Sequence, residues 1–186
     1  MINKIAIIGL GSIGSRYLGI LKSRFRDIEI IVVRSGKGSR SLDEKLANDV
    51  VYSIEDSIKM GVEAAIISSP ATEHLEQAIK LTKAGVHILI EKPLSISLNG
   101  IQELIQIINK NKVIALVGYV LRYDPAANAF KNYIDSNTLG NILSVNINCS
   151  SFLPDWRPDK DYKQSVSASK DLGGGVLLEL SHELDY

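Results

Sequence analysis

A glycine-rich segment near the start of the chain has the residue types and spacing of a phosphate-binding turn. Residues 9–14 read GLGSIG, which matches the pattern G-x-G-x-x-G. An apolar run precedes this segment and a helical pattern follows it, which is the context that gives the pattern meaning. The helix start offers free N–H groups and a partial positive charge to a pyrophosphate. We therefore interpret the segment as a dinucleotide site, and the alternative is a turn without a ligand. The predicted contacts are Gly9, Gly11, Ser12, Ile13 and Gly14.

The residues about 20 positions after this turn distinguish the two nicotinamide dinucleotides. An NAD site usually carries an Asp or Glu there, which accepts a hydrogen bond from the ribose 2′-hydroxyl. This chain has Arg34 and Ser35 instead, and no carboxylate occurs between Glu29 and Asp43. Cationic and hydroxyl donors suit a 2′-phosphate, so we predict NADP rather than NAD, with NAD as the second choice. A solvated basic loop is the alternative interpretation. Further basic side chains in this loop are Lys37 and Arg40.

A lysine follows the fifth apolar run, in the sequence Glu91-Lys92-Pro93. Ligands of parallel sheets bind at the carboxyl ends of the strands, where this lysine is expected. The proline after it restricts the local backbone. Taken alone, a lysine in such a place is most often only solvated.

A histidine, His182, follows a glycine triplet at residues 173–175. Histidine titrates near neutral pH and can therefore act as an acid or a base. Glu179 and Asp185 lie three residues before and after it, so one continuous helix would place all three on roughly one face. The alternative is a structural histidine.

The elements that must position these residues alternate between strand and helix. Six short apolar runs predict strands buried on both faces of a sheet. We expect them at residues 5–8, 28–33, 50–52, 64–67, 86–90 and 113–117. Helices are predicted over residues 12–25, after Thr72 as N-cap up to Gly85, and over residues 101–108. This alternation predicts a doubly wound parallel Rossmann sheet, an α/β fold, over residues 1–120.

The pattern changes in residues 121–186, where we predict the start of a second, α+β domain. A helix is expected over residues 125–134, and a long loop over residues 154–169. Residues 143–149 alternate between apolar and polar side chains, which is typical of an open antiparallel sheet. One strand and one helix cannot bury a core. This unit is therefore predicted to be incomplete or to pack against something else.

Composition excludes several classes of partner. Lys plus Arg and Asp plus Glu both count 21, so no general attraction to nucleic acid or to an anionic membrane is expected. No apolar run approaches the roughly 20 residues of a membrane span. The only cysteine, Cys149, fits a reducing, cytoplasmic setting. No metal site is predicted.

The ordered set of motifs resembles the Gfo/Idh/MocA oxidoreductases, and the resemblance covers the whole chain. It implies a nicotinamide-dependent hydride transfer on a sugar or cyclitol. It also implies a Rossmann domain paired with a second domain on a large, mostly antiparallel sheet. The motifs, besides the glycine turn and the glycine triplet, are Ser68-Ser69-Pro70 with His74, Ala84-Gly85-Val86-His87, Glu91-Lys92-Pro93, Arg122-Tyr123-Asp124-Pro125, and His182 with Asp185.

The resemblance also implies roles for individual residues. Lys92 would contact the nicotinamide ribose and the substrate hydroxyl, and would assist proton transfer as hydride moves. His182 would be the second acid–base residue. The other implied cofactor contacts are Ser68, Ser69, Pro70, His74, Glu91, Arg122, Trp156 and Arg157.

Two features depart from the family pattern. An Asp usually stands four residues before the histidine, whereas this chain has Glu179 three residues before His182. The chain is also much shorter than the resemblance implies. Two hypotheses follow: an NADP-dependent sugar oxidoreductase, expected in bacterial surface-sugar metabolism, or a truncated dinucleotide-binding module without turnover. An S-adenosylmethionine-dependent transferase fits the glycine turn and the Glu-Lys-Pro motif less well. Relatives often associate through the second-domain sheet, which makes a homo-oligomer a candidate assembly.

Overall fold

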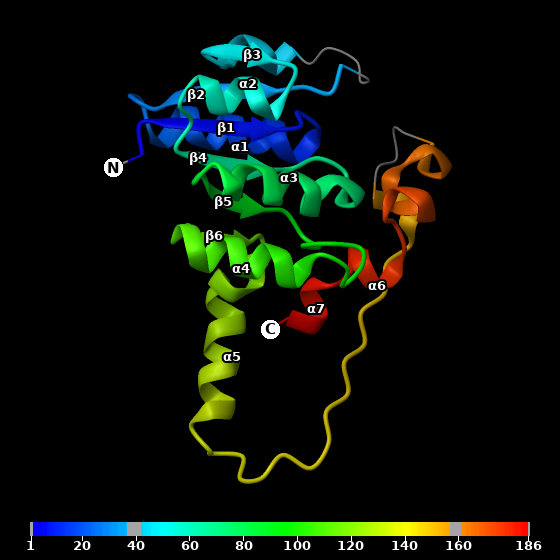
Figure 1. The fold of residues 1–186 in the computed structure, drawn as a ribbon. Helices are drawn as coiled ribbons and strands as arrows, with labels where there is room; N and C mark the ends of the chain where they lie inside the picture. The colour runs from blue at the N-terminus through cyan, green and yellow to red at the C-terminus, as the bar shows by residue number, and fades with distance from the viewer. Residues whose placement is uncertain (1, 37–41, 157–160, 186) are drawn as a thin grey trace. The chain divides into compact units, whose positions relative to one another are not determined.

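Six short apolar runs form one parallel sheet, with the strand order β3-β2-β1-β4-β5-β6 (Figure 1). The computed structural model describes residues 2–36, 42–156 and 161–185. Every neighbouring pair of strands is parallel. This is the strand order of the dinucleotide-binding Rossmann fold, which confirms the predicted doubly wound sheet. The strands are β1 (Lys4–Ile8), β2 (Glu29–Val33), β3 (Asp49–Val51), β4 (Ala64–Ile67), β5 (His87–Ile90) and β6 (Ala115–Val117).

In the residues that the structure describes, four α-helices lie between these strands. They are α1 (Ser12–Arg24), α2 (Ile54–Lys59), α3 (Ala71–Lys83) and α4 (Ile101–Asn111). The prediction of Thr72 as the N-cap of α3 was wrong, because Pro70 holds that position and the helix begins one residue before Thr72. Proline lacks a backbone N–H. It is tolerated at the start of a helix, because an N–H there would have no intrahelical partner. Gly85 follows the end of α3 with φ +80°, as predicted for a left-handed helix end.

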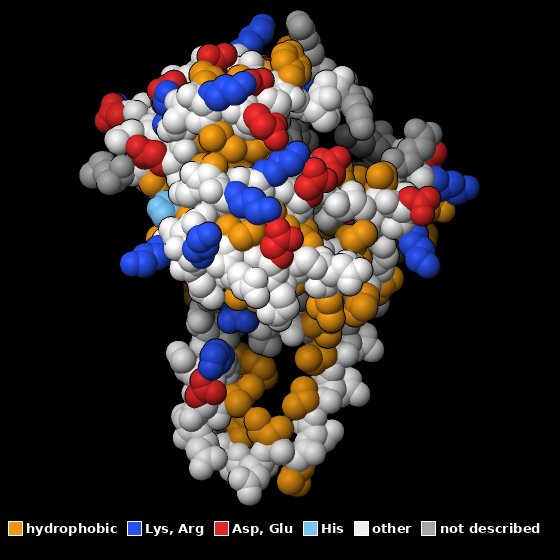
Figure 2. All heavy atoms as spheres, viewed as in Figure 1, with side chains coloured by type: hydrophobic (Ala, Val, Ile, Leu, Met, Phe, Trp, Pro, Cys, Tyr) orange, Lys and Arg blue, Asp and Glu red, His pale blue; other side chains and the backbone are white. Residues whose placement is uncertain are grey.

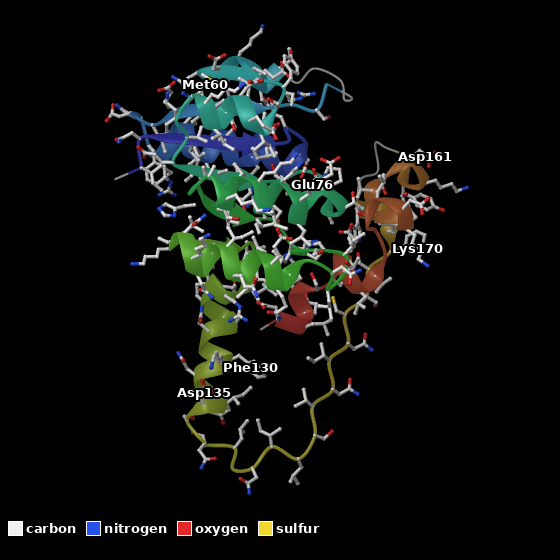
Figure 3. The ribbon with its side chains drawn as sticks, viewed as in Figure 1. Met60, Glu76, Phe130, Asp135, Asp161 and Lys170 are labelled. Carbon is white, nitrogen blue, oxygen red and sulfur yellow. The ribbon has the colours of Figure 1, made fainter. Side chains whose placement is uncertain are left out.

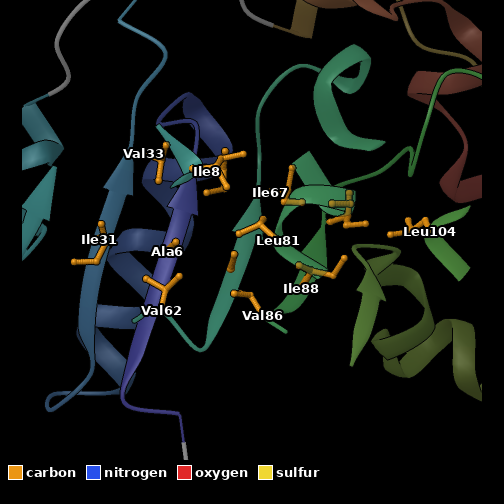
Figure 4. Close-up of a cluster of buried hydrophobic side chains, with 14 residues drawn as sticks. Ala6, Ile8, Ile31, Val33, Val62, Ile67, Leu81, Val86, Ile88 and Leu104 are labelled. Carbon is orange, nitrogen blue, oxygen red and sulfur yellow. The ribbon is translucent and has the colours of Figure 1, made fainter. Parts of the chain in front are cut away.

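Side chains of successive strand residues enter two separate hydrophobic clusters, one on each face of the sheet. Ile5 and Ile7 of β1 pack with Leu18 and Leu21 of α1. The intervening residues of the sheet pack with α2, α3 and α4 in the second cluster, which Figure 4 shows. A strand with helices on both faces must be apolar at every position. The continuous apolar runs in the sequence therefore reflect burial on both sides.

The chain divides into two compact units, Met1–Val117 and Gly118–Tyr186. The described part of the second unit contains one long helix, α5 (Pro125–Asp135), and two short ones, α6 (Val176–Glu179) and α7 (His182–Asp185). The predicted long loop contains short 3₁₀ turns instead of being fully irregular. These and the other 3₁₀ turns are η1 (Leu42–Leu46), η2 (Val120–Tyr123), η3 (Leu153–Trp156), η4 (Tyr162–Gln164), η5 (Val166–Ala168) and η6 (Lys170–Leu172).

Two predictions for the second unit were wrong. Residues 143–149 form no strand, and their apolar side chains are exposed. Figure 2 shows hydrophobic side chains exposed along the extended segment, and Figure 3 shows Phe130 projecting from α5. A strand needs a neighbour for its backbone N–H and C=O groups, and no described residue supplies one. The second error concerns Glu179 and His182, which belong to two short helices separated by Leu180 and Ser181 and not to one continuous helix face.

Candidate functional site

The glycine turn has the backbone geometry that a phosphate-binding turn requires. Gly9 adopts φ +87°, and its N–H donates to the carbonyl oxygen of Val33 over 2.9 Å. A side chain at Gly14 would place its Cβ only 2.1 Å from the Gly9 oxygen, so the turn and α1 pack as closely as glycine allows. At Gly11 a Cβ would meet no atom within 4 Å. The turn therefore leaves open space beside Gly11, where a phosphate could approach the backbone.

The start of α1 completes this anion site. Gly11 is its N-cap and has no side chain to occupy the free N–H groups, and the first turn carries no acidic residue. Ser12 and Ile13 are exposed there. A helix N-terminus without acidic neighbours favours bound negative charge. These residues fit the pyrophosphate of a dinucleotide.

The loop after β4 is bonded directly to the glycine turn. The Ser68 hydroxyl donates to the carbonyl oxygen of Gly9 over 2.9 Å and lies 3.1 Å from that of Ile8. The next residue, Ser69, donates its hydroxyl to the side-chain oxygen of Gln77 in α3 over 2.7 Å. Ser68 therefore holds the turn in place through its side chain. Direct contact of Ser68, Ser69 and Pro70 with a cofactor stays a prediction.

His74 joins two loops of the site. Its side chain is buried, with Nδ1 2.8 Å from the carbonyl oxygen of Pro93 and Nε2 2.9 Å from that of Ser69. The ring thus links the loop after β4 to the loop that contains Lys92. We interpret His74 as a positioning residue, and cofactor contact by it stays a prediction.

Glu91 and Lys92 lie at the carboxyl end of β5, and a residue missed by sequence reasoning holds the glutamate. The Tyr17 hydroxyl donates to Glu91 Oε1 over 2.6 Å, and the Lys92 backbone N–H donates to Glu91 Oε2 over 3.2 Å. Burial, together with the hydrogen bond to Glu91, raises the pKa of Tyr17 well above its ordinary value. The peptide bond between Lys92 and Pro93 is cis. The only signal for Tyr17 was its position three residues after Gly14, on the helix that opens at the turn.

Arg34 extends β2 beside the glycine turn, and its side chain already has an acidic partner. Its backbone N–H donates to the carbonyl oxygen of Val51 over 2.9 Å. Its guanidinium forms an ion pair with Glu44 of η1. Glu44 stands just past the window in which the sequence showed no carboxylate. Ser35 is exposed, and Lys37 and Arg40 lie outside the described residues.

The candidates in the second unit form a cluster of their own. The rings of Tyr119 and His182 meet edge to face, with their centres 5.7 Å apart. The Arg122 guanidinium donates to both carboxylate oxygens of Asp185, over 2.6 and 2.9 Å. Elsewhere in this unit, the Trp156 indole N–H donates to the Ser151 hydroxyl over 2.6 Å. Arg157 lies outside the described residues.

No group of three or more His, Cys, Asp or Glu side chains in residues 2–36, 42–156 and 161–185 is arranged to hold a metal ion. The helices in the same ranges include none that is long and apolar enough to cross a membrane.

The strand order, the glycine turn and the polar residues after β4 and β5 define a dinucleotide-binding protein of the Rossmann class. The chain belongs to the Gfo/Idh/MocA family, an oxidoreductase family with an NAD-binding Rossmann fold, which it matches over residues 3–119.

Similar proteins include cyclitol dehydrogenases. The inositol 2-dehydrogenase of Salmonella typhimurium is 31% identical over 191 residues, covering 98% of this chain and 52% of that protein. The 2,7-anhydro-N-acetylneuraminate hydratase of Mediterraneibacter gnavus is 28% identical over 188 residues, covering 97% of this chain and 47% of the hydratase. The crystal structure of myo-inositol 2-dehydrogenase from Lactobacillus plantarum matches with a TM-score of 0.68 and 26% identity, over 76% of this chain and 43% of that one. The chain thus spans about half the length of the curated relatives it matches.

Proposed function

We propose that the chain carries the cofactor site and the principal acid–base residue of an NADP-dependent oxidoreductase. Its reaction is hydride transfer to or from a hydroxyl or ketone of a sugar or cyclitol. One observation carries this proposal: the glycine turn and the Glu91–Lys92 pair lie at the carboxyl edge of the same sheet, and Tyr17 of α1, the helix that begins in the turn, donates a hydrogen bond to Glu91. Such a reaction needs an anion site for the cofactor and a potential proton donor at the same edge of the sheet.

Lys92 is the residue that we assign to proton transfer. The nicotinamide, when bound, accepts or supplies the hydride. During oxidation, the neutral Lys92 amine accepts the proton that the substrate hydroxyl loses, and during reduction the Lys92 ammonium donates a proton to the substrate oxygen. Glu91, held by Tyr17, lies beside the backbone of Lys92, and His74 holds the adjoining loop through Pro93. His182 is proposed as the second acid–base residue, in the unit that follows.

Arg34 and Ser35 are the residues that favour NADP over NAD in this proposal. They follow β2 directly, and the Val33 carbonyl before them accepts the Gly9 N–H. A guanidinium binds a phosphate monoester through two parallel hydrogen bonds. The pyrophosphate is assigned to the backbone of Gly11, Ser12 and Ile13. Further cofactor contacts are proposed for Ser68, Ser69, Pro70, His74, Glu91, Arg122, Trp156 and Arg157.

The substrate class is inferred from the relatives, which include inositol dehydrogenases and a protein named for an anhydro-sialic acid. A hydratase among these relatives means that family membership alone does not decide the net reaction. The proposed setting in bacterial surface-sugar metabolism rests on the segment at residues 153–157, which resembles that of members with such substrates. The lone, exposed Cys149 favours a reducing, cytoplasmic location, and a homo-oligomer is the proposed assembly.

A second candidate function is dinucleotide binding without turnover. It is favoured by the second unit, in which no described hydrophobic residue is buried. Turnover needs a site that excludes water and orients the sugar.

Consumption of NADPH in the presence of keto-inositols and keto-sugars tests the proposal. We expect turnover that falls about 100-fold or more in Lys92→Met, because a positioned acid–base residue contributes that much. The affinity for NADPH, followed by fluorescence, should stay close to that of the unchanged chain. The matched control is Lys59→Met, since Lys59 is an exposed lysine at the end of α2. A Lys92→Met protein that keeps its rate contradicts the proposed mechanism. NADPH binding without turnover on any of these substrates supports the second candidate.

A further inference from the structure

The ion pair between Arg34 and Glu44 is placed where the cofactor's adenosine ribose is expected. Arg34 directly follows Val33, whose carbonyl oxygen accepts the N–H of Gly9 in the glycine turn. The two paired side chains are only 10% and 19% exposed. An ion pair that is largely withdrawn from water attracts more strongly than one at the surface. Any ligand that binds the Arg34 guanidinium must therefore compete with the Glu44 carboxylate.

Both partners are anchored by their backbones. The N–H of Arg34 donates to Val51 of β3, which keeps this residue in line with the sheet. Glu44 belongs to η1, which ends at Leu46. Asn48, two residues further along, is bonded to β2 twice: its N–H donates to the Ile30 oxygen over 2.9 Å, and its side-chain oxygen accepts the Ile30 N–H over 3.0 Å. The carboxylate is thus held against the guanidinium by a preformed scaffold.

We propose that Glu44 is a specificity-determining residue: it competes with the 2′-phosphate of NADP for Arg34 and so narrows the preference for NADP over NAD. This inference rests on the proposed function, which makes Arg34 the receiver of that phosphate. If Arg34 turns to the phosphate, Glu44 is left partly buried without this partner, which is costly. If Arg34 holds both groups, two negative charges lie side by side. NAD has no phosphate at this position, so either cost falls on NADP alone.

The test measures dissociation constants for NADPH and NADH by fluorescence titration of the full chain. In Glu44→Gln, which keeps the size of the side chain and removes its charge, we expect the affinity for NADPH to rise about tenfold relative to NADH. The matched control is Glu29→Gln. It removes the same charge at the opposite end of β2, where Glu29 pairs with Lys4, and the NADPH-to-NADH ratio should stay within about twofold of the unchanged chain.

An Arg34→Leu background shows whether the effect passes through the guanidinium. The gain from Glu44→Gln should vanish there, because the competition needs Arg34. Glu44→Asp, which withdraws the charge by one methylene, provides a second variant if circular dichroism shows that Glu44→Gln does not fold. It should give a smaller rise of the same sign.

Three results overturn the inference: an unchanged ratio in the folded Glu44 variant, a shift toward NADH, or a gain that persists without Arg34. A shift toward NADH would mean that Glu44 orients Arg34 for the phosphate. The proposed function fails separately, and this inference with it, if the unchanged chain binds neither dinucleotide.

Discussion

The two units of this chain carry similar apolar patterns but bury them very differently. In the first unit, each central strand has a neighbour on both sides and helices on both faces, and the two hydrophobic clusters result. In the described part of the second unit, no hydrophobic side chain is buried, and Leu143 is 95% exposed. Hydrophobic burial is the main favourable term in folding. Apolar patterning therefore stabilises a segment only where the fold supplies a partner surface.

A helix and an extended segment of the second unit respond differently to the lack of a partner surface. The helix α5 forms although its Phe130 and Tyr133 are exposed. Its backbone bonds are internal, and the Asp124 side chain accepts from the N–H groups of Ala126 and Ala127 at its start. The segment at residues 143–149 cannot form such internal hydrogen bonds, because the N–H and C=O groups of a strand bond to a neighbouring strand. Helices can thus persist without tertiary partners more readily than strands.

The largest expected effect tests the contrast in burial directly. Leu18→Ala empties a fully buried position in α1 and should lower the free energy of unfolding by about 2–5 kcal/mol. Leu143→Ala, at an exposed position, should change it by less than about 0.5 kcal/mol. Urea titrations followed by far-ultraviolet circular dichroism measure both. Equal losses in the two variants would mean that residue 143 is buried in solution.

Two tightly packed glycines offer the next comparison, one in each unit. Gly14→Ala forces a Cβ to within 2.1 Å of the Gly9 oxygen, and Gly174→Ala forces one to within 2.2 Å of the Val166 oxygen. We expect Gly14→Ala to destabilise the first unit by about 1–3 kcal/mol, because the backbone must shift. Circular dichroism reports mainly this unit, whereas fluorescence of Trp156, the only tryptophan, reports the second. Gly174→Ala should lower the midpoint of the unfolding transition seen by fluorescence and leave the one seen by circular dichroism unchanged. A shift of both transitions would show that the units unfold together.

The smallest effect concerns two polar contacts. Tyr17→Phe removes the part-buried bond to Glu91 and should cost about 1 kcal/mol near neutral pH. The folded state raises the pKa of Tyr17 above its ordinary value. This stabilisation is therefore complete below about pH 10 and is lost as the pH rises further. The unchanged chain should lose stability above about pH 10 more steeply than Tyr17→Phe.

The control is Asp185→Asn at the exposed Arg122 contact, for which no shift of the urea midpoint is expected. Parallel pH profiles for Tyr17→Phe and the unchanged chain would contradict the assigned bond.

Much of the first unit could be predicted because its signals are local. Apolar runs such as residues 5–8 and 64–67 identified the strands, and Gly85 identified a helix end. The six-residue helix α2 was missed, since two turns are too short for a clear period. The prediction of a strand at residues 143–149 was wrong for a different reason. Alternation of apolar and polar residues specifies which side chains share a face, but it does not supply the neighbouring strand that the backbone needs.

The sequence by itself determined the glycine turn, the order of strands and helices in the first unit, the position of Lys92 after a strand, and the family. Only the tertiary structure decided which polar groups meet. It brought Glu44 to Arg34, Tyr17 to Glu91 and the Pro93 carbonyl to His74. The physical reason is that side-chain periodicity reports which face of an element is buried. A hydrogen bond or ion pair depends instead on where the chain returns, and that is set by the packing of the whole sheet.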